Sequence, residues 1–184
     1  MSGSAPSPSA LRVSDLPTRG SRSFELCPKP DEMTMIAQTL GVDAVRKLRF
    51  AGDIAVHGKK DWNLSGLLGA TVVQPCAVTL APVTTRIDVT VQRFYISDYT
   101  DPDSPEAEMP EDDTIEPLGT WIDPHAVMLE ALSLEIPEYP RADGAALGET
   151  VLTESGKAPL RDADLKPFAG LAALKAQLED DQDR

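Results

Sequence analysis

The chain has few cysteines, few histidines and no long apolar run, and each shortage excludes a class of protein. Its two cysteines, Cys27 and Cys76, are too few for a secreted scaffold built on disulfide bonds. No apolar run reaches the roughly 18–20 residues that a membrane-spanning helix needs, so we expect no integral membrane protein and no membrane partner. The first residues lack the basic start and apolar core of a secretory signal. We therefore expect a reduced, cytoplasmic protein.

Catalytic signatures are missing as well. The two histidines, His57 and His125, have no partner that the sequence can assign, and general-base catalysis needs an oriented partner. There is no nucleophile elbow, phosphate-binding loop, zinc-protease histidine pair or dinucleotide glycine pattern. The sequence therefore predicts no catalytic residue and a protein that is not an enzyme. A small hydrolase or transferase is the alternative, and only His57 and the acidic residues support it.

The metal-binding motifs that this sequence approaches are incomplete. Cys76 lies at the mouth of an expected hairpin, and a zinc ribbon would carry a second cysteine three residues later, where Thr79 stands. Acidic residues between 101 and 113 offer oxygen ligands, but the prolines among them and the lack of a calcium-loop glycine pattern favour a solvated loop. We therefore expect no metal and no other cofactor, and we interpret Cys76 as a small, partly buried thiol. The acidic residues in question are Asp101, Asp103, Glu111, Asp112 and Asp113.

What the chain has in plenty is acid, and it is unevenly placed. Of 184 residues, 30 are Asp or Glu and 17 are Lys or Arg, which gives a net charge of −13. Residues 1–95 hold 8 acidic and 11 basic residues, whereas residues 96–140 hold 13 acidic residues and no basic one. With 41% hydrophobic residues, the composition is that of a soluble globular protein. We therefore expect a polarised molecule, with a mildly basic first half and an acidic second half.

Helical spacing of apolar residues predicts three helical regions. The first begins at Asp31 as N-cap and reaches Gly41, and a short second helix after it is expected to hold Val45 and Arg46. Another begins at Asp123, where a capping carboxylate precedes a proline. The predicted helical regions are 31–46, 123–135 and 168–179.

From Leu48 the apolar residues alternate with polar ones, which predicts an antiparallel sheet over about residues 48–96. A turn is expected at 58–61, a return segment at 62–73 and a long strand at 83–95. Together with the helices this gives an α+β fold with a strongly twisted sheet and flanking helices. The sequence does not decide whether this sheet also closes into a partial barrel.

Composition also divides the chain. Residues 1–22, rich in Ser, Pro and Arg, are expected to be a disordered tail. A single domain is expected over 23–179, interrupted by an acidic, proline-containing loop at 97–118. Residues 180–184 are expected to form an acidic tail.

The basic residues of the first half are the only concentration that can meet nucleic-acid phosphate. Arg49 and Arg86 alternate with apolar residues, so both are expected on the solvent-exposed face of the sheet. Arg93 is counted among the basic residues that can meet phosphate. An ordinary solvated face is the alternative, because 17 basic residues in 184 are no excess. The candidate nucleic-acid-binding residues are Arg46, Lys47, Arg49, Lys59 and Lys60.

The acidic region repels RNA phosphate and is complementary to a basic protein. Part of it lies in the loop at 97–118, which is expected to adapt its shape to a partner. The alternative is a loop that only keeps the domain soluble. The candidate partner-binding residues are Glu111, Asp112, Asp113 and Glu116.

The order of several weak motifs resembles that of a known family. These are Arg46-Lys47-Leu48, the turn at Asp61-Trp62, the stretch LGATVVQPCAVTLAPVTTRIDVTVQRFY at 68–95, WIDPHAVMLEALSLEIPEYPR at 121–141 and KPFAGLAALK at 166–175. In this order they resemble the YceD family of large ribosomal RNA subunit accumulation proteins, and most of all its alphaproteobacterial branch. The resemblance covers about residues 14–178.

This resemblance implies a non-enzymatic role in the accumulation, processing or stability of large-subunit (23S) ribosomal RNA. The implied partners are that RNA or its precursor particle, and a basic ribosomal protein. Many relatives carry a Cys-x-x-Cys hairpin and further cysteines near the C-terminus. Here Thr79 replaces the second cysteine and YPRADGA stands at 139–145, so a metal role does not carry over from those relatives.

Overall fold

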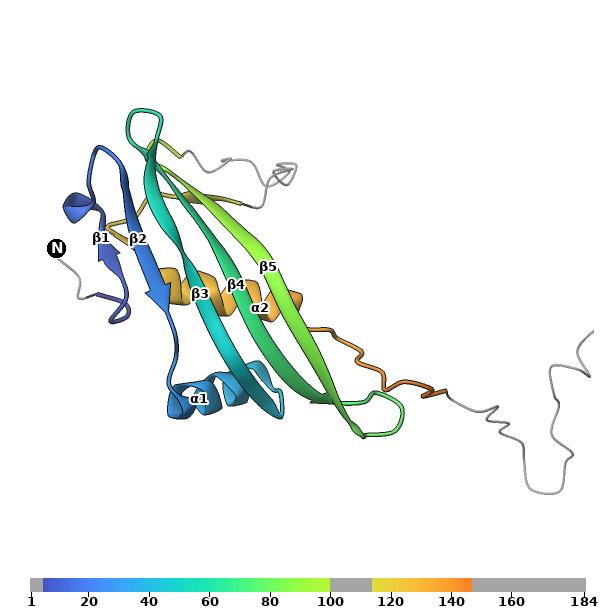
Figure 1. Cartoon of the computed structure of the whole chain (residues 1–184). Coiled ribbons are helices and arrows are strands. Elements are labelled where there is room, and N and C mark those ends of the chain that lie inside the picture. Colours follow the sequence, from blue (N-terminus) through green and yellow to red (C-terminus); the bar gives the residue numbers. More distant parts are fainter. Residues whose placement is uncertain (1–4, 100–113, 147–184) are drawn as a thin grey trace, which may run out of the picture. The chain divides into compact units, whose positions relative to one another are not determined.

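A mixed five-stranded sheet, in the order β2-β3-β4-β5-β6, forms the centre of the structure (Figure 1). This computed structural model describes residues 5–99 and 114–146. Two helices and a small sheet of β1 and β7 accompany the large sheet. The strands are β1 (Leu11–Arg12), β2 (Ser21–Leu26), β3 (Ala44–His57), β4 (Asp61–Pro75), β5 (Pro82–Ile96), β6 (Ile115–Pro117) and β7 (Trp121–Ile122), and the helices are α1 (Pro30–Leu40) and α2 (Pro124–Glu135).

Strands β2 to β5 pair antiparallel, as the alternating pattern predicts. The β3–β4 turn begins at Gly58, whose φ of 67° costs glycine no steric energy. β6 lies within the stretch expected as a loop and pairs parallel to β5, with Phe94 opposite Ile115. The α+β class is therefore confirmed, and the sheet is mostly antiparallel but mixed.

One face of the sheet forms the core. Phe50 of β3 and Leu64 and Leu68 of β4 are almost completely buried on it, in one cluster with Met128 and Leu132 of α2. Figure 1 shows α2 behind the strands. Burying a side chain of this size contributes about 1.5–3 kcal/mol, so this layer is a main source of stability. Within the described residues no helix or strand covers the opposite face, which is called the open face below.

The predicted start of α2 at Asp123 is confirmed, whereas α1 begins earlier than predicted and ends earlier than the first predicted helical region. Its N-cap is Lys29 and not Asp31, because the carboxylate of Glu32 accepts the backbone N–H of Lys29 at 2.9 Å. Asp123 caps α2 by accepting a hydrogen bond from the backbone N–H of His125 at 3.0 Å. α1 ends before Gly41, which has a φ of 67°, and the chain then enters β3. The short helix expected over residues 42–46 is therefore wrong. Val45 is buried there as part of the strand, where a β-branched side chain packs well.

β3 contains a bulge that the sequence does not reveal. Its pairing with β4 shifts between Arg46 and Arg49, and Lys47 in between has a φ of 51°. Arg46 stands opposite Thr71 and Arg49 opposite Gly69, so two residues of β3 face a single residue of β4. A bulge of this kind bends a strand and changes the direction of its side chains.

Residues 11–22 differ from the expected tail, because they form β1, a short 3-10 turn and the start of β2. Leu11 pairs with Ile122, and Leu16 is buried in the core. These contacts reach segments far along the chain, and the local composition holds no sign of them.

Several predicted segments lie outside the described residues. They are most of the acidic loop (100–113), the helix at 168–179 and the tail at 180–184. The described residues up to 145 belong to the first of two compact units, and the second comprises residues 146–184. In the described ranges, neither helix has the length and apolar character to cross a membrane.

Candidate functional site

The five candidate nucleic-acid-binding residues fall into two groups at opposite ends of β3. Arg46, Lys47 and Arg49 lie near its start, whereas Lys59 and Lys60 lie in the turn after its end. All five are exposed. The twelve positions from Lys47 to Lys59 correspond to about 40 Å of extended strand. The five residues therefore do not form one contiguous surface.

Two arginines of the open face have acidic partners within the fold. Arg49 Nε donates to Glu25 Oε1 at 2.9 Å, and Arg86 makes a two-point contact with Asp88 on the same strand. The hydrogen bond to Glu25 raises the pKa of Arg49, and the one from Arg86 lowers the pKa of Asp88. All four side chains are close to half exposed or more, so water screens both pairs and they contribute little to stability.

Arg93 points into the fold instead of toward solvent. It follows Val91 and precedes Tyr95 in the alternation of β5, and only 8% of it is exposed. Its Nη2 donates to Glu130 Oε1 of α2 at 2.7 Å, and its Nε lies 3.2 Å from Glu116 Oε1 of β6. Arg93 thus joins β5, β6 and α2. The prediction that Arg93 is available to bind phosphate is therefore wrong. The sequence contained a sign of this, because Arg93 stands at a position of the β5 alternation that is otherwise apolar and buried.

Glu116, a candidate partner-binding residue, is engaged in this junction. Burial raises its pKa, and the charge of Glu130 adds to that effect, while Arg93 opposes it. Its carboxylate therefore has a partner inside the fold. The other three candidates, Glu111, Asp112 and Asp113, lie outside the described residues.

Cys76 lies where β4 turns toward β5, and its sulphur accepts hydrogen bonds from three backbone N–H groups. Those of Val78 and Thr79 are each 3.4 Å away, and that of Ala142 is 3.3 Å away. The residue is fully buried, where the sequence predicted partial burial. Cys76 thus fastens the segment after α2 to the β4–β5 hairpin.

These contacts do not fit a zinc site. A structural zinc ion takes four nitrogen or sulphur ligands, but Thr79 stands where a second thiolate would be, and Ala142 offers an N–H. Cys76 is the buried one of the two free cysteines, and Cys27 is exposed in another part of the fold. In the portion of the chain that the structure describes, no three His, Cys, Asp or Glu residues are grouped to hold a metal ion.

The Cys76 thiol is expected to make stability depend on pH. The N–H of Ala142, then the groups of Thr79 and Val78, lower its pKa from 9.0 to about 6, against the effect of desolvation. A lowered pKa means that the thiolate contributes stability above pH 9 and loses it as the pH falls through about 6. The difference in unfolding free energy between the wild type and Cys76→Ser should therefore grow from pH 6 to pH 9. Urea unfolding at several pH values measures this, with Cys27→Ser as the matched control, and a constant difference would contradict it.

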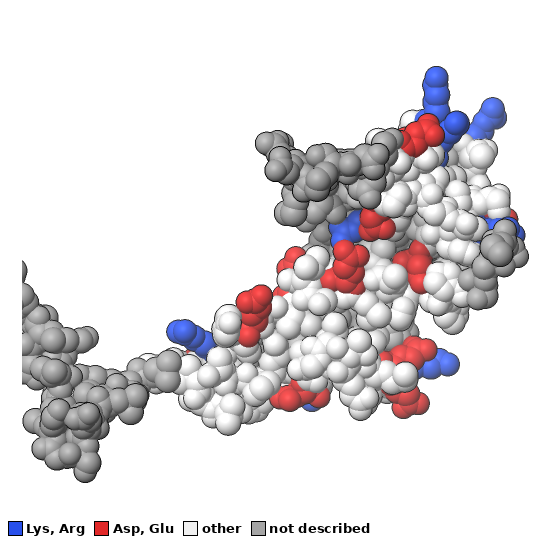
Figure 2. Space-filling model, turned by 180° about the vertical axis from the view of Figure 1, so that it is seen from behind, with Lys and Arg blue, Asp and Glu red and all other residues white. Residues whose placement is uncertain are grey.

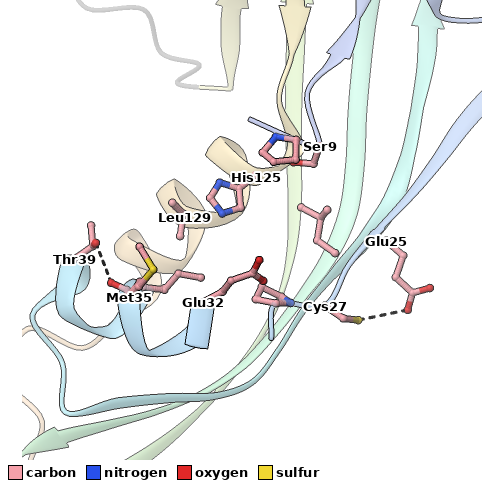
Figure 3. A pocket seen from close by; sticks show the side chains of 12 residues that line it. Ser9, Glu25, Cys27, Glu32, Met35, Thr39, His125 and Leu129 are labelled. Atoms are coloured by element: carbon pink, nitrogen blue, oxygen red, sulfur yellow. Dashed lines mark hydrogen bonds between the residues drawn. The ribbon is translucent and has the colours of Figure 1, made fainter. Parts of the chain in front are cut away.

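A hollow of about 420 Å³ lies between α1 and α2 and contains two side chains of catalytic type (Figure 3). Cys27 and His125 both line it, but Cys27 is directed toward Glu25 and donates to its Oε1 at 3.8 Å. Within the described ranges no hydrogen bond links Cys27 to His125. Nucleophilic catalysis needs a base in contact with the nucleophile, so these two residues are not arranged as a catalytic pair.

Figure 2 shows the face on which α2 lies. Acidic side chains are spread over its middle, and basic side chains project at its upper end, where the β3–β4 turn lies in Figure 1. Single basic side chains also lie among the acidic ones, so the two signs are only partly separated on this face.

A comparison with protein families gives one match. The family described as large ribosomal RNA subunit accumulation protein YceD matches residues 64–175, which is more than half of the chain. No curated protein and no solved structure matches the chain.

Proposed function

Because the chain belongs to the YceD family of large ribosomal RNA subunit accumulation proteins, we propose that it is a non-enzymatic factor of ribosome biogenesis in the cytoplasm. It supports the accumulation or processing of large-subunit (23S) ribosomal RNA. The observation that carries this proposal is the family match over residues 64–175, which includes the β4–β5 hairpin and α2.

The charge distribution supports two kinds of contact with the precursor particle. RNA phosphate is repelled by the acidic segment at 96–140, so RNA contacts come from the basic residues of the first half. The acidic segment is complementary to basic ribosomal proteins. A hydrolase or transferase is the alternative, and it gains no support from Cys27, whose thiol donates to Glu25 and not to His125.

Co-sedimentation tests the proposal. Tagged full-length protein in a cell lysate is separated on a sucrose gradient, and its position is compared with that of large-subunit precursor particles. We expect it in the precursor fractions, and ribonuclease treatment should release it to the top of the gradient. A protein that stays at the top in untreated lysate, while depletion of the protein leaves 23S RNA levels unchanged, would contradict the proposal.

Neutralising Glu111, Asp112 and Asp113 to Gln, Asn and Asn is expected to weaken capture of ribosomal proteins and to lower its salt sensitivity. The reason is that charge attraction between exposed groups is screened by salt. The thermal midpoint should stay nearly unchanged, because the sequence predicts a solvated acidic loop here and charges in such a loop contribute little to stability. Glu116 is left intact, since it contacts Arg93. Pull-down of purified ribosomal proteins at several salt concentrations measures the effect, and equal capture at equal salt would show that the loop only provides solubility.

A further inference from the structure

The bulge in β3 brings two arginines to the same face of the sheet. Arg46 and Arg49 are three positions apart, and in a regular strand residues three apart point to opposite faces. The extra residue at Lys47 restores the alternation, so that Arg46 stands opposite Thr71 and Arg49 opposite Gly69. Both partners lie on the open face. A non-glycine residue with a φ of 51° is uncommon, and such backbone often marks a functional position.

A third arginine joins them from β5. Arg86 is the cross-strand partner of Thr71 and donates to its Oγ1 at 3.4 Å, so Arg46, Thr71 and Arg86 form one row across three strands. Gly69 lies in the next row beside Arg49. A side chain at Gly69 would come within 2.7 Å of Arg86 Nη2, so the glycine allows this guanidinium to lie across β4.

Arg46, Arg49 and Arg86 together are called the arginine cluster. A hollow of about 280 Å³ on this part of the sheet is lined by Arg49, Gly69 and Arg86. The start of the acidic segment is remote, because the ten steps along β5 from Arg86 to Ile96 span about 30 Å. Its end lies nearer, since the carbonyl oxygen of Pro137 accepts a hydrogen bond from Gln74 of β4.

Among the residues that the structure describes, two carboxylates contact the arginine cluster. Glu25 holds Arg49 and Asp88 holds Arg86, and both pairs are solvent-exposed and screened. An arginine has five N–H donors in a planar fork, so it can bind a phosphate with donors that these carboxylates leave free. Arg46 forms no ion pair within the described ranges.

From this geometry we infer that the arginine cluster binds the phosphate backbone of RNA. The inference rests on the proposed function and names the surface that carries its RNA contact. Arginine is suited to this ligand because its planar guanidinium group can donate two parallel hydrogen bonds to two oxygens of a phosphate. Lys59 and Lys60, at the other end of β3, do not belong to this surface.

Filter binding tests the inference with an in vitro transcript of large-subunit ribosomal RNA over a series of salt concentrations. The variant Arg46→Gln/Arg49→Gln/Arg86→Gln removes three charges from the cluster. Each lost phosphate contact lowers the salt dependence by about 0.7–0.9. We expect the slope to fall by about 2 and the affinity at low salt to fall about tenfold or more.

The matched control, Arg12→Gln/Arg19→Gln/Arg22→Gln, removes three exposed charges that belong neither to the cluster nor to the other candidate RNA-binding residues. We expect its affinity for the RNA to stay within about threefold of wild type. The reason is that attraction by the net charge contributes less to this affinity than direct contacts between side chains and phosphates do. Replacing the three cluster arginines by lysine should leave the salt dependence of binding unchanged, because the charges remain. It should lower the affinity in part, because the two-point hydrogen bonds of the guanidinium groups are lost. Thermal unfolding verifies that all variants fold.

Other outcomes overturn the inference. An equal loss in both glutamine variants would mean that net charge alone attracts RNA. Unchanged binding by the cluster variant would place the contact elsewhere. Wild-type protein that sediments with precursor particles but does not retain the transcript would exclude direct RNA binding and leave the proposed function intact, and a partner protein would then carry the contact.

Discussion

Replacing Arg93 by leucine is expected to lower the free energy of unfolding by about 2–3 kcal/mol. Removing one partner of a buried charge pair costs roughly 3–5 kcal/mol, and the value here is smaller because both carboxylates are partly exposed. Without the cation, Glu116 and Glu130 lie close together with no charge between them. Urea unfolding at pH 7 measures the loss.

The pH dependence identifies the cause of this loss. Glu116 already has a raised pKa in the wild type, and removing Arg93 raises it further. A raised carboxyl pKa favours the folded state below the ordinary pKa, and this advantage is lost as the pH rises through the folded-state value. The deficit of Arg93→Leu should therefore shrink as the pH falls from 7 to 5. Adding Glu116→Gln and Glu130→Gln should recover most of the stability at pH 7, and no recovery would show that lost packing caused the effect.

Gly52→Ala is expected to destabilise the protein by about 3 kcal/mol or more. A Cβ at Gly52 would lie 2.0 Å from the carbonyl oxygen of Ser65 and 2.5 Å from Cα of Gly66. These are backbone atoms of the paired strand β4, so they cannot move aside without breaking the β3–β4 ladder. Overpacking of a core costs about 1–3 kcal/mol where side chains can adjust, and the cost is larger where they cannot.

Gly119→Ala is the matched control for this prediction. Its Cβ would meet nothing closer than 3.9 Å, so we expect a change within about 0.5 kcal/mol. Chemical denaturation and hydrogen exchange of the β3 amides report the two effects. A Gly52→Ala protein as stable as Gly119→Ala would mean that the two strands can separate locally without loss.

The sequence by itself determined the features that depend on neighbouring residues. The alternation of β5, the turn at Gly58 and the cap at Asp123 follow from local periods and local hydrogen bonds, and all three are confirmed. The α+β class and the YceD family follow from the order of such segments. The division of charge along the chain is likewise a property of the sequence alone.

Only the tertiary structure decided which residues meet across the chain. From the sequence, Arg93 is one basic residue among others, and only the structure shows that Glu116 and Glu130 lie beside it. From the sequence, Cys76 is a single thiol, and only the structure shows that Ala142, sixty-six residues away, donates an N–H to its sulphur. Both contacts depend on strand register and on the path of the chain after α2, and no local pattern encodes these.

The bulge at Lys47 shows the same limit most clearly. A strict period of two places Arg46 and Arg49 on opposite faces, and the sequence predicted a short helix over residues 42–46. Pairing with β4 selects the strand and inserts one extra residue, because Val45 and Leu48 must both be buried while Arg46 and Arg49 remain exposed. Burial of apolar side chains therefore fixed the register, and the register placed the arginines together.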